Sequence, residues 1–357
     1  MLRPHEEPAA RTATEELFGP ILVLIPFEDE EAAYRIANGT AYALTAGVFS
    51  RSPATIARAT RAIVVGTIYV NRGTTGARVG IEPFGGLHMS GTGPKAGGPD
   101  YLWAFVRRID APEDTEDERA AIAGGPIAAF AFPSLLAARW DAPLEARIEA
   151  VERAAVLLGS RGDPDAGALL AAAQSARREL GAAVPTPPVA GQHTELRYDL
   201  PRGLGVVRAP GSNAAWWLAA PLLAGNAVAV IDAAPVATLI AALRVGGVPA
   251  HVLLALDGGI PAMLAAAGSD MTRSEVTGPH EVAFATSDGG PALARALHER
   301  LGPTYEGQRG LKAQIGTLEG PQPGERGFVQ RFAWPRVVAI RTLRHGADLA
   351  IETSGAG

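Results

Sequence analysis

The chain contains no cysteine among its 357 residues. Disulfide bonds, thiolate metal sites, iron–sulfur clusters and a cysteine nucleophile are therefore excluded within it, because each needs a cysteine sulfur. Lysine is almost as rare, with Lys95 and Lys312 as the two examples, so arginine carries nearly all of the positive charge. Any chemistry that depends on a thiolate must draw it from outside these residues.

The chain also lacks the charge and hydropathy patterns of several protein classes. A net charge of −5 without clustered Lys and Arg gives no basic surface for phosphates, so nucleic acid is not expected as a partner. Residues 1–13 carry charges and no apolar core, which is unlike a signal peptide and favours a cytoplasmic location. The long uncharged segment, 209–231, contains two prolines and a Gly-Asn pair. It predicts a buried strand, helix and second strand rather than a membrane span.

The first hundred residues alternate strand and helix signals, the pattern of an α/β fold. The apolar run 21–27 predicts a strand, and a helix is expected from the acidic residues 28–31 to Gly39. Ser52 and Pro53 predict the start of a helix that runs through Arg61, and 67–71 predicts the next strand. Glycine-rich loops follow over 73–98.

The composition then changes, which predicts a boundary. Residues 111–119 hold a proline and five carboxylates, as expected of a linker. A helix-rich stretch is predicted over 135–180, a proline-rich spacer over 184–189, and a second α/β pattern from Leu204. The resulting division is a first segment at 1–110, an acidic and Gly/Pro-containing linker at 111–134, and a second domain at 135–357.

Several motifs occur in one order along the first segment and together resemble the aldehyde dehydrogenase superfamily. They are Glu15-Glu16-Leu17-Phe18-Gly19-Pro20, Ala37 to Ala46, Asn71-Arg72, Pro83-Phe84-Gly85-Gly86 and Ser90-Gly91-Thr92-Gly93. The resemblance implies that Glu16 contacts the nicotinamide ribose of NAD and that Phe18 lies beside the nicotinamide.

Two further features resemble L-glutamate γ-semialdehyde (1-pyrroline-5-carboxylate) dehydrogenases. Thr75-Gly76-Ala77 resembles the anchor loop that holds the substrate carboxylate through backbone N–H groups, and residues 95–102 resemble the ending of that class. Small residues suit this role because they leave N–H donors uncovered. The resemblance implies that Gly76 and Ala77 bind substrate and that Phe84 walls its aliphatic part. Glu82 stands where the family often has Gln, and a carboxylate there is expected to weaken anion binding.

The second half resembles the nucleotide-binding half of the same superfamily in degenerate form. Ile231 and Asp232 stand where active members carry Lys-Pro, and 278–283 replaces a Gly-Ser-Thr-Glu-Val-Gly turn. Residues 328–351 resemble the final strand pair of long proline utilization A proteins. The expected fold class is therefore α/β: the C-terminal part of an aldehyde dehydrogenase catalytic domain followed by a degenerate Rossmann-like aldehyde-dehydrogenase-superfamily domain.

Two functional hypotheses remain open. In the first, the chain is the C-terminal portion of an NAD-dependent L-glutamate γ-semialdehyde dehydrogenase. It is inactive alone for lack of the catalytic cysteine, and it needs a missing N-terminal part or a separate catalytic chain. In the second, it is a non-catalytic scaffold, passage-enclosing or assembly module of a proline-catabolic complex. The family resemblance also implies a homo-oligomer. No metal site is expected, because the His-Glu pairs at His5, His280 and His298 lack the second histidine of a zinc motif.

Overall fold

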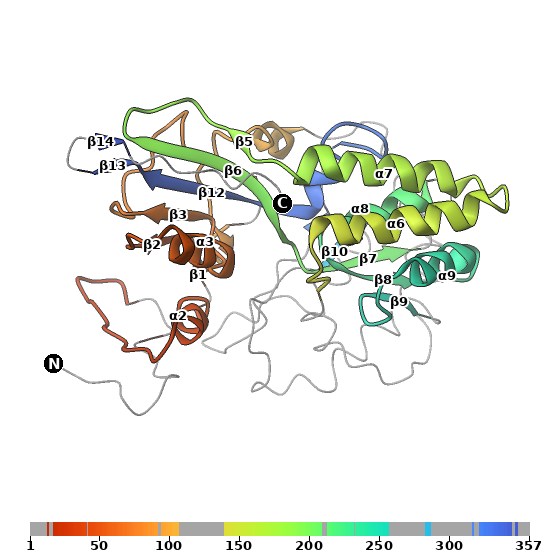
Figure 1. Cartoon of the computed structure of the whole chain (residues 1–357), viewed down its shortest axis with the longest axis horizontal. Helices are drawn as coiled ribbons and strands as arrows, with labels where there is room; N and C mark the ends of the chain where they lie inside the picture. Colours follow the sequence, from red (N-terminus) through yellow and green to blue (C-terminus); the bar gives the residue numbers. More distant parts are fainter. Residues whose placement is uncertain are drawn as a thin grey trace.

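The computed structural model describes residues 13, 17–40, 42–91, 94–106, 139–208, 213–231, 233–256, 283–286, 316–317, 321–344 and 347–348. Two five-stranded sheets organise these residues. One sheet lies beside helices α2 (Glu30–Ala37) and α3 (Pro53–Ala62), and the other lies beside four helices, α6 to α9, between Leu144 and Gly246 (Figure 1). The α/β fold class is confirmed.

The first sheet is mixed and joins strands from both halves of the chain. Its order is β2 (Thr45–Val48), β3 (Thr67–Val70), β12 (Ala333–Arg341), β6 (Gln192–Pro201) and β5 (Val184–Pro185). β2, β3 and β12 are parallel, while β6 runs antiparallel to β12 and to β5. β6 and β12 extend as a long pair from the second sheet to β3 (Figure 1). Strands from before and after the predicted linker therefore complete one sheet.

The two helices of the first segment begin where the sequence predicts. α2 spans Glu30–Ala37, and the Asp29 side chain accepts a hydrogen bond from the N–H of Ala32. α3 spans Pro53–Ala62, and the Ser52 side chain caps it in the same way. Such caps satisfy N–H groups that have no partner within the helix. Both helix predictions are confirmed.

The predicted strand at 21–27 is not formed. Residues 20–27 have no regular secondary structure, and most of their large apolar side chains are exposed. A β-strand needs a neighbour to satisfy its backbone groups. Among the described residues this run pairs with no strand. The apolar pattern alone was therefore not sufficient to form the predicted strand.

The second sheet is parallel, in the order β11-β10-β7-β8-β9. The first strand in sequence, β7, is central; β8 and β9 lie on one side of it and β10 and β11 on the other. This is the arrangement of a Rossmann-like fold, with the reversal of strand order between β7 and β10. The strand bounds are β7 Leu204–Arg208, β8 Ala227–Ile231, β9 Leu253–Leu256, β10 Ala283–Thr286 and β11 Gly316–Thr317.

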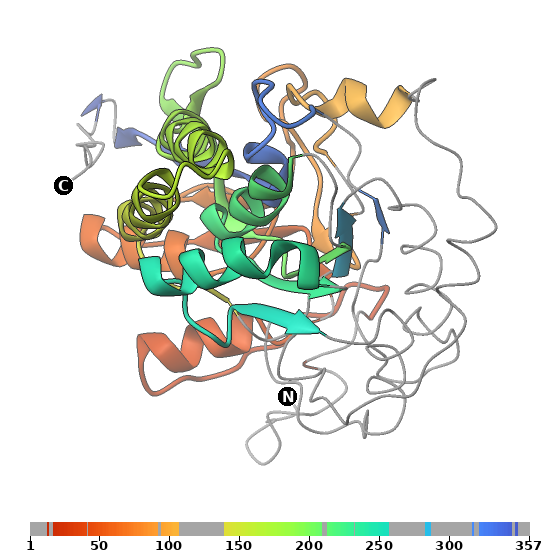
Figure 2. The same cartoon turned by 90° about the vertical axis from the view of Figure 1, so that its right-hand side faces the viewer.

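Four helices cover one side of this sheet. α8 (Ala214–Leu223) and α9 (Ala237–Gly246) lie next to the sheet, and α6 (Leu144–Gly159) and α7 (Asp165–Leu180) form an outer layer over them (Figure 2). The predicted helix-rich stretch is thus confirmed over its described part. The helix and second strand expected in 209–231 are α8 and β8, and no helix of the described residues has the length and hydrophobicity required to cross a bilayer.

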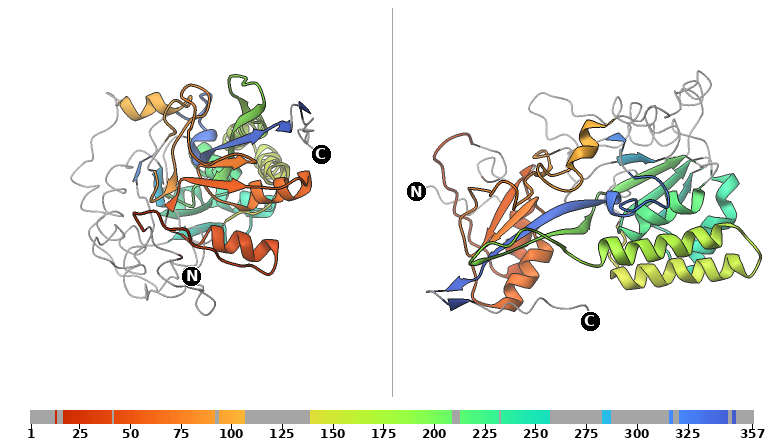
Figure 3. Two further views of the ribbon diagram at one scale, coloured as in Figure 1. Left: turned by 90° about the vertical axis from the view of Figure 1, so that its left-hand side faces the viewer. Right: turned by 90° about the horizontal axis from the view of Figure 1, so that it is seen from above.

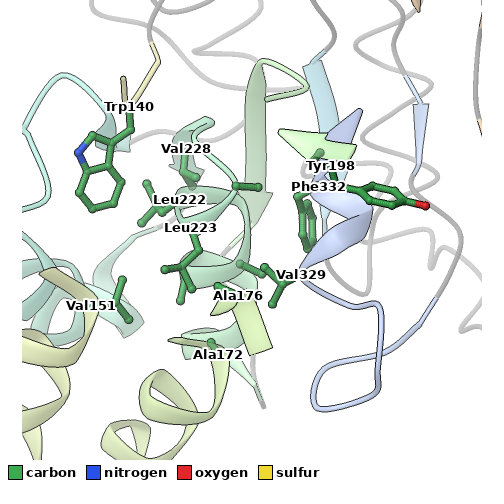
Figure 4. Packing of buried hydrophobic residues seen from close by; sticks show 14 of the residues in the cluster. Trp140, Val151, Ala172, Ala176, Tyr198, Leu222, Leu223, Val228, Val329 and Phe332 are labelled. Atoms are coloured by element: carbon green, nitrogen blue, oxygen red, sulfur yellow. The ribbon is translucent and has the colours of Figure 1, made fainter. Parts of the chain in front are cut away.

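The core lies between these layers. Leu222 and Leu223 of α8 gather with Ala176 of α7 and Val329 from the C-terminal part of the chain (Figure 4). Because α8 is buried on every side, its apolar residues belong to a protein interior.

The remaining elements are short. The pair β13–β14 lies beyond the far end of β12 (Figure 3). The short elements are β1 (Tyr42–Ala43), β4 (Leu87–His88), β13 (Leu343–Arg344), β14 (Ala347–Asp348) and the 3-10 turns η1 (Tyr101–Phe105), η2 (Ala234–Val236) and η3 (Gln330–Phe332).

Candidate functional site

The fold brings two of the sequence motifs together. β1 and β4 pair so that Ala43 faces Leu87, and the N–H of Ala43 donates to Oγ of Ser90 at 3.0 Å. Gly66, just before β3, packs so tightly on this region that a Cβ there would lie 2.0 Å from the carbonyl oxygen of Gly85. The described residues of the motif at 37–46 and of the motifs between 83 and 91 therefore form one unit against the start of β3.

The motif asparagines hold this unit in place. Asn38 donates to the carbonyl of Ala62 at 2.8 Å and accepts from the N–H of Val64 at 2.9 Å. Asn71, with φ of 56°, exchanges two hydrogen bonds with the backbone of Ser50, at 2.9 and 3.0 Å. Both side chains tie loops to each other, so their part in any site is to fix the scaffold.

The loop 72–82, which we call the anchor loop because it contains the predicted substrate segment Thr75-Gly76-Ala77, starts shortly after β3. Gly76 has φ of +78°, a left-handed conformation that glycine adopts without steric cost, and a Cβ there would meet open space. Its carbonyl accepts from Nη2 of Arg72 at 3.3 Å. The N–H groups of Gly76 and Ala77 donate to no acceptor in the described part of the chain. The loop thus offers backbone donors without a side chain over Gly76.

Glu82, at the end of the anchor loop, is 2% exposed and paired. Its Oε1 lies 2.7 Å from Nη1 of Arg72, while its Oε2 accepts from the N–H of Arg78 at 3.2 Å and from the Tyr69 hydroxyl at 3.4 Å. Burial and the adjacent Glu82 carboxylate raise the pKa of Tyr69. Because Arg72 neutralises Glu82, the carboxylate does not present the unpaired negative charge that the sequence alone suggests.

The other predicted site residues are only partly brought together. Phe84 is half-buried and fixed by two backbone hydrogen bonds with Ala96, at 3.0 and 2.9 Å, directly after the anchor loop. Phe18 is 102% exposed, so its side chain contacts none of the others. Glu16 lies outside the described residues. Gly76, Ala77 and Phe84 therefore remain the predicted substrate residues, on neighbouring stretches of chain, while Phe18 is the one predicted cofactor residue among those described.

The sequence singled out Lys95 as part of an ending but not as a buried amine. Its Nζ donates to the carbonyl of Gly85, and the residue is 3% exposed. Burial lowers the pKa of Lys95 from 10.5 to about 7, since the charged form loses its hydration. A lysine between glycine-rich loops gave the only sequence signal for this position.

The lowered pKa of Lys95 predicts that the stability of the fold depends on pH. The unfolded chain keeps the amine protonated up to about pH 10.5, whereas the folded chain releases the proton near pH 7. Stability therefore rises as the pH increases through this window, by about 1.4 kcal/mol for each unit of pKa difference and on the order of a few kcal/mol in total.

The measurement is urea unfolding of the wild type and Lys95→Met between pH 7 and 10.5. As the pH rises, the unfolding free energy of the wild type should increase relative to that of Lys95→Met. The other titrating groups are common to both proteins and cancel in this comparison. A difference that stays constant across the window contradicts a deprotonated Lys95.

The ending of the first segment docks on the second half. Asp100 accepts from the Tyr198 hydroxyl of β6 and lies 3.5 Å from Nε2 of Gln330. Burial and Asp100 raise the pKa of Tyr198. Arg202, whose guanidinium lies 4.1 Å from the ring centroid of Trp334, has its pKa lowered to about 10 by burial. These contacts between distant segments could not be found from the motifs.

The second sheet provides little for a nucleotide. Ile231, at the end of β8, is fully buried, so an apolar side chain lies where the resemblance expects a ribose-binding lysine. Asp232 and the turn 278–282 lie outside the described residues. The described part of this sheet therefore does not fit NAD at that position.

Comparisons with known proteins agree with the motifs. Residues 5–108 match the model of the "Aldehyde dehydrogenase family". Proteins named 1-pyrroline-5-carboxylate dehydrogenase from a Geobacillus species and from Bacillus subtilis are 51% and 50% identical over 96 and 93 residues, which is 27% and 26% of this chain. These stretches make up 19% and 18% of the two relatives, so the chain spans about a fifth of their length.

A solved structure covers more of the chain. Proline utilization A from Corynebacterium freiburgense aligns with 95% of it at a TM-score of 0.52 and 21% identity, over 27% of that protein's length. At this identity the match shows a shared fold. Residues 5–108 are therefore a segment of the aldehyde dehydrogenase family, within a chain whose overall fold resembles part of a proline utilization A structure.

Proposed function

We propose that the chain is the C-terminal portion of an NAD-dependent L-glutamate γ-semialdehyde dehydrogenase, which oxidises the semialdehyde to L-glutamate in proline degradation. The observation that carries this proposal is the anchor loop, where Gly76 and Ala77 offer backbone N–H donors to a carboxylate. Relatives that share half of the residues in this region are named 1-pyrroline-5-carboxylate dehydrogenase.

The residues of the chain would bind and orient the substrate. Gly76 and Ala77 would hold its carboxylate by charge-assisted hydrogen bonds, and Phe84 would pack against its methylene groups. Phe18 has an open face for a planar ring, which fits a nicotinamide, and Glu16 would bind the ribose. When bound, NAD supplies the acceptor for the hydride that the aldehyde carbon loses.

The thiolate that attacks the aldehyde must come from residues outside these 357. The chain has no cysteine, and serine or threonine lacks the nucleophilicity of a thiolate. Exposed apolar side chains in the run 17–27 support an additional protein segment here, because contiguous apolar surface of this kind is usually covered. They are Leu17, Phe18, Ile21, Leu22, Leu24 and Phe27.

The test is reconstitution. The purified chain, given the semialdehyde and NAD, should form no NADH above the rate without protein. Joined to, or mixed with, the cysteine-containing remainder of a related dehydrogenase, it should form NADH, and a serine in place of that cysteine should abolish the reaction. NADH formation by the chain alone would overturn the proposal.

A non-catalytic scaffold is the second candidate, and the buried Ile231 favours it for the second half. The two are distinguished by Gly76→Val in the reconstituted enzyme. If the loop binds substrate, this variant raises KM for the semialdehyde; if the chain only supports assembly, KM is unchanged while light scattering shows the same assembly. Light scattering of the chain alone also tests the proposed homo-oligomer.

A further inference from the structure

We propose that Gln192, in the second half of the chain, is a positioning residue for the carboxylate-binding anchor loop of the first half. The consequence for substrate rests on the proposed function, whereas the effect on the loop does not. The loop would then be held in its binding conformation by both halves together.

The side-chain amide of Gln192 is bonded at both ends. Its Oε1 accepts from Nη1 of Arg72 at 2.5 Å, and its Nε2 donates to Oε1 of Glu82 at 2.6 Å and to Oγ1 of Thr194 at 2.7 Å. An amide has both an acceptor and donors, and here each faces a group of matching kind. A flipped amide would set NH₂ against a guanidinium and oxygen against a carboxylate, so the network fixes its orientation.

The sheet explains why Gln192 reaches this loop. Ile340 of β12 is paired with Val70 at the end of β3 on one side and with His193 at the start of β6 on the other. One residue beyond this row lies Asn71, the neighbour of the anchor loop, on the first side and Gln192 on the second side. The N–H of Thr342 also donates to the carbonyl of Gly191 at 3.0 Å, which fixes the backbone next to Gln192.

Gln192 contacts the two side chains that hold the anchor loop. Arg72 donates to the carbonyl of Gly76, and Glu82 accepts from the N–H of Arg78, so this pair brackets the donors of Gly76 and Ala77. The loop itself is largely exposed. Without Gln192, Arg72 and Glu82 would keep their ion pair but lose the amide that fixes the orientation of both side chains. The loop would then leave its present conformation more often.

Hydrogen exchange of the full chain, followed by mass spectrometry, tests this without turnover. Gln192→Leu should increase exchange about tenfold at the loop amides that are hydrogen-bonded, those of Arg78, Ile81 and Glu82, as expected when hydrogen bonds to charged groups are lost. Exchange in β3 and β12 should stay as in the wild type. Gln330→Leu is the matched control, because it removes another amide that faces a first-segment carboxylate, Asp100.

A charge exchange separates positioning from general packing. Gln192→Glu alone sets two carboxylates against each other and should speed exchange of the anchor loop. Adding Glu82→Gln restores one amide and one carboxylate beside Arg72, and should return exchange to near the wild-type rate. If the double variant exchanges as fast as Gln192→Glu, or if exchange rises equally in β3 and β12, the proposal is overturned.

The substrate arm uses the reconstituted enzyme. Gln192→Leu should raise KM for the semialdehyde with little change in kcat, and leave KM for a short aldehyde without a carboxylate unchanged. If the loop exchanges faster and both KM values are unchanged, the proposed binding of the substrate carboxylate by the loop is refuted, while the positioning of the loop by Gln192 remains supported. An unchanged loop would refute the positioning itself.

Discussion

Residues 1–110 expressed alone are expected to show no cooperative unfolding transition. In the full chain β3 pairs with β12, and Ile68, Tyr69 and Val70 of β3 are all 0% exposed. Without the second half, one edge of β3 has no partner and its apolar side chains face water. Apolar burial is the main favourable term in folding, and unpaired strand edges promote aggregation. Circular dichroism with urea titration provides the measurement.

Co-expression with residues 135–357 provides the control. If the proposed linker at 111–134 only connects the two parts, the two pieces should associate and recover the cooperative transition of the full chain. A soluble fragment 1–110 that unfolds cooperatively by itself would show that β12 and β6 are dispensable for the first segment. The boundaries at 110 and 135 stay a prediction until then.

The helices of the first segment could be predicted because their signals are local. Asp29 and Ser52 each cap a helix within three residues, so the sequence specifies the start without knowledge of the rest of the chain. The strand expected at 21–27 was wrong for the opposite reason. Its apolar pattern is equally local, but a strand forms only with a partner, and no partner is present among the described residues.

The long strand β6 shows a signal that was missed. Leu196, Tyr198 and Leu200 alternate with polar residues and are all buried, which is the pattern of a half-buried strand. The second α/β pattern was expected to begin only at Leu204, after β6. The pairing of β6 with β12 in a sheet that also contains β3 could not be read from alternation, because register and neighbours depend on distant segments.

The candidate site divides in the same way. The motifs located Gly76, Ala77 and Phe84 because these lie within one short stretch of chain. Gln192 contacts Glu82 across 110 residues of sequence, and nothing near it marks that contact. From the sequence alone the carboxylate of Glu82 is therefore an isolated charge, although Arg72 and Gln192 bind it in the fold.

Asp199→Ala is expected to lower the free energy of unfolding by about 3 kcal/mol, because it leaves a buried arginine without its counterion. Arg336 of β12 is 1% exposed and donates to both carboxylate oxygens of Asp199. It also donates to the carbonyls of Thr60 and Ile63 at the end of α3. That helix end carries partial negative charge, so Arg336 joins the first segment to β12 and β6 through two kinds of acceptor.

Arg336→Met should cost less than Asp199→Ala. It leaves two carbonyls without a donor, but the Asp199 side chain is 34% exposed and water can hydrate it. The double variant Arg336→Met with Asp199→Leu should be more stable than Asp199→Ala alone, since no buried charge remains unpaired. Urea unfolding of the full chain gives all three values.

Arg58→Met provides a matched control. Arg58 also makes a bidentate ion pair, with Glu30, but the Arg58 side chain is 49% exposed. Exposed ion pairs contribute little because water already solvates both charges, so this variant should unfold close to the wild type. If Asp199→Ala and Arg58→Met have equal small effects, burial does not make the Arg336–Asp199 ion pair more important for stability than an exposed one. The two halves must then be joined chiefly by the apolar contacts and backbone pairing of β3 with β12.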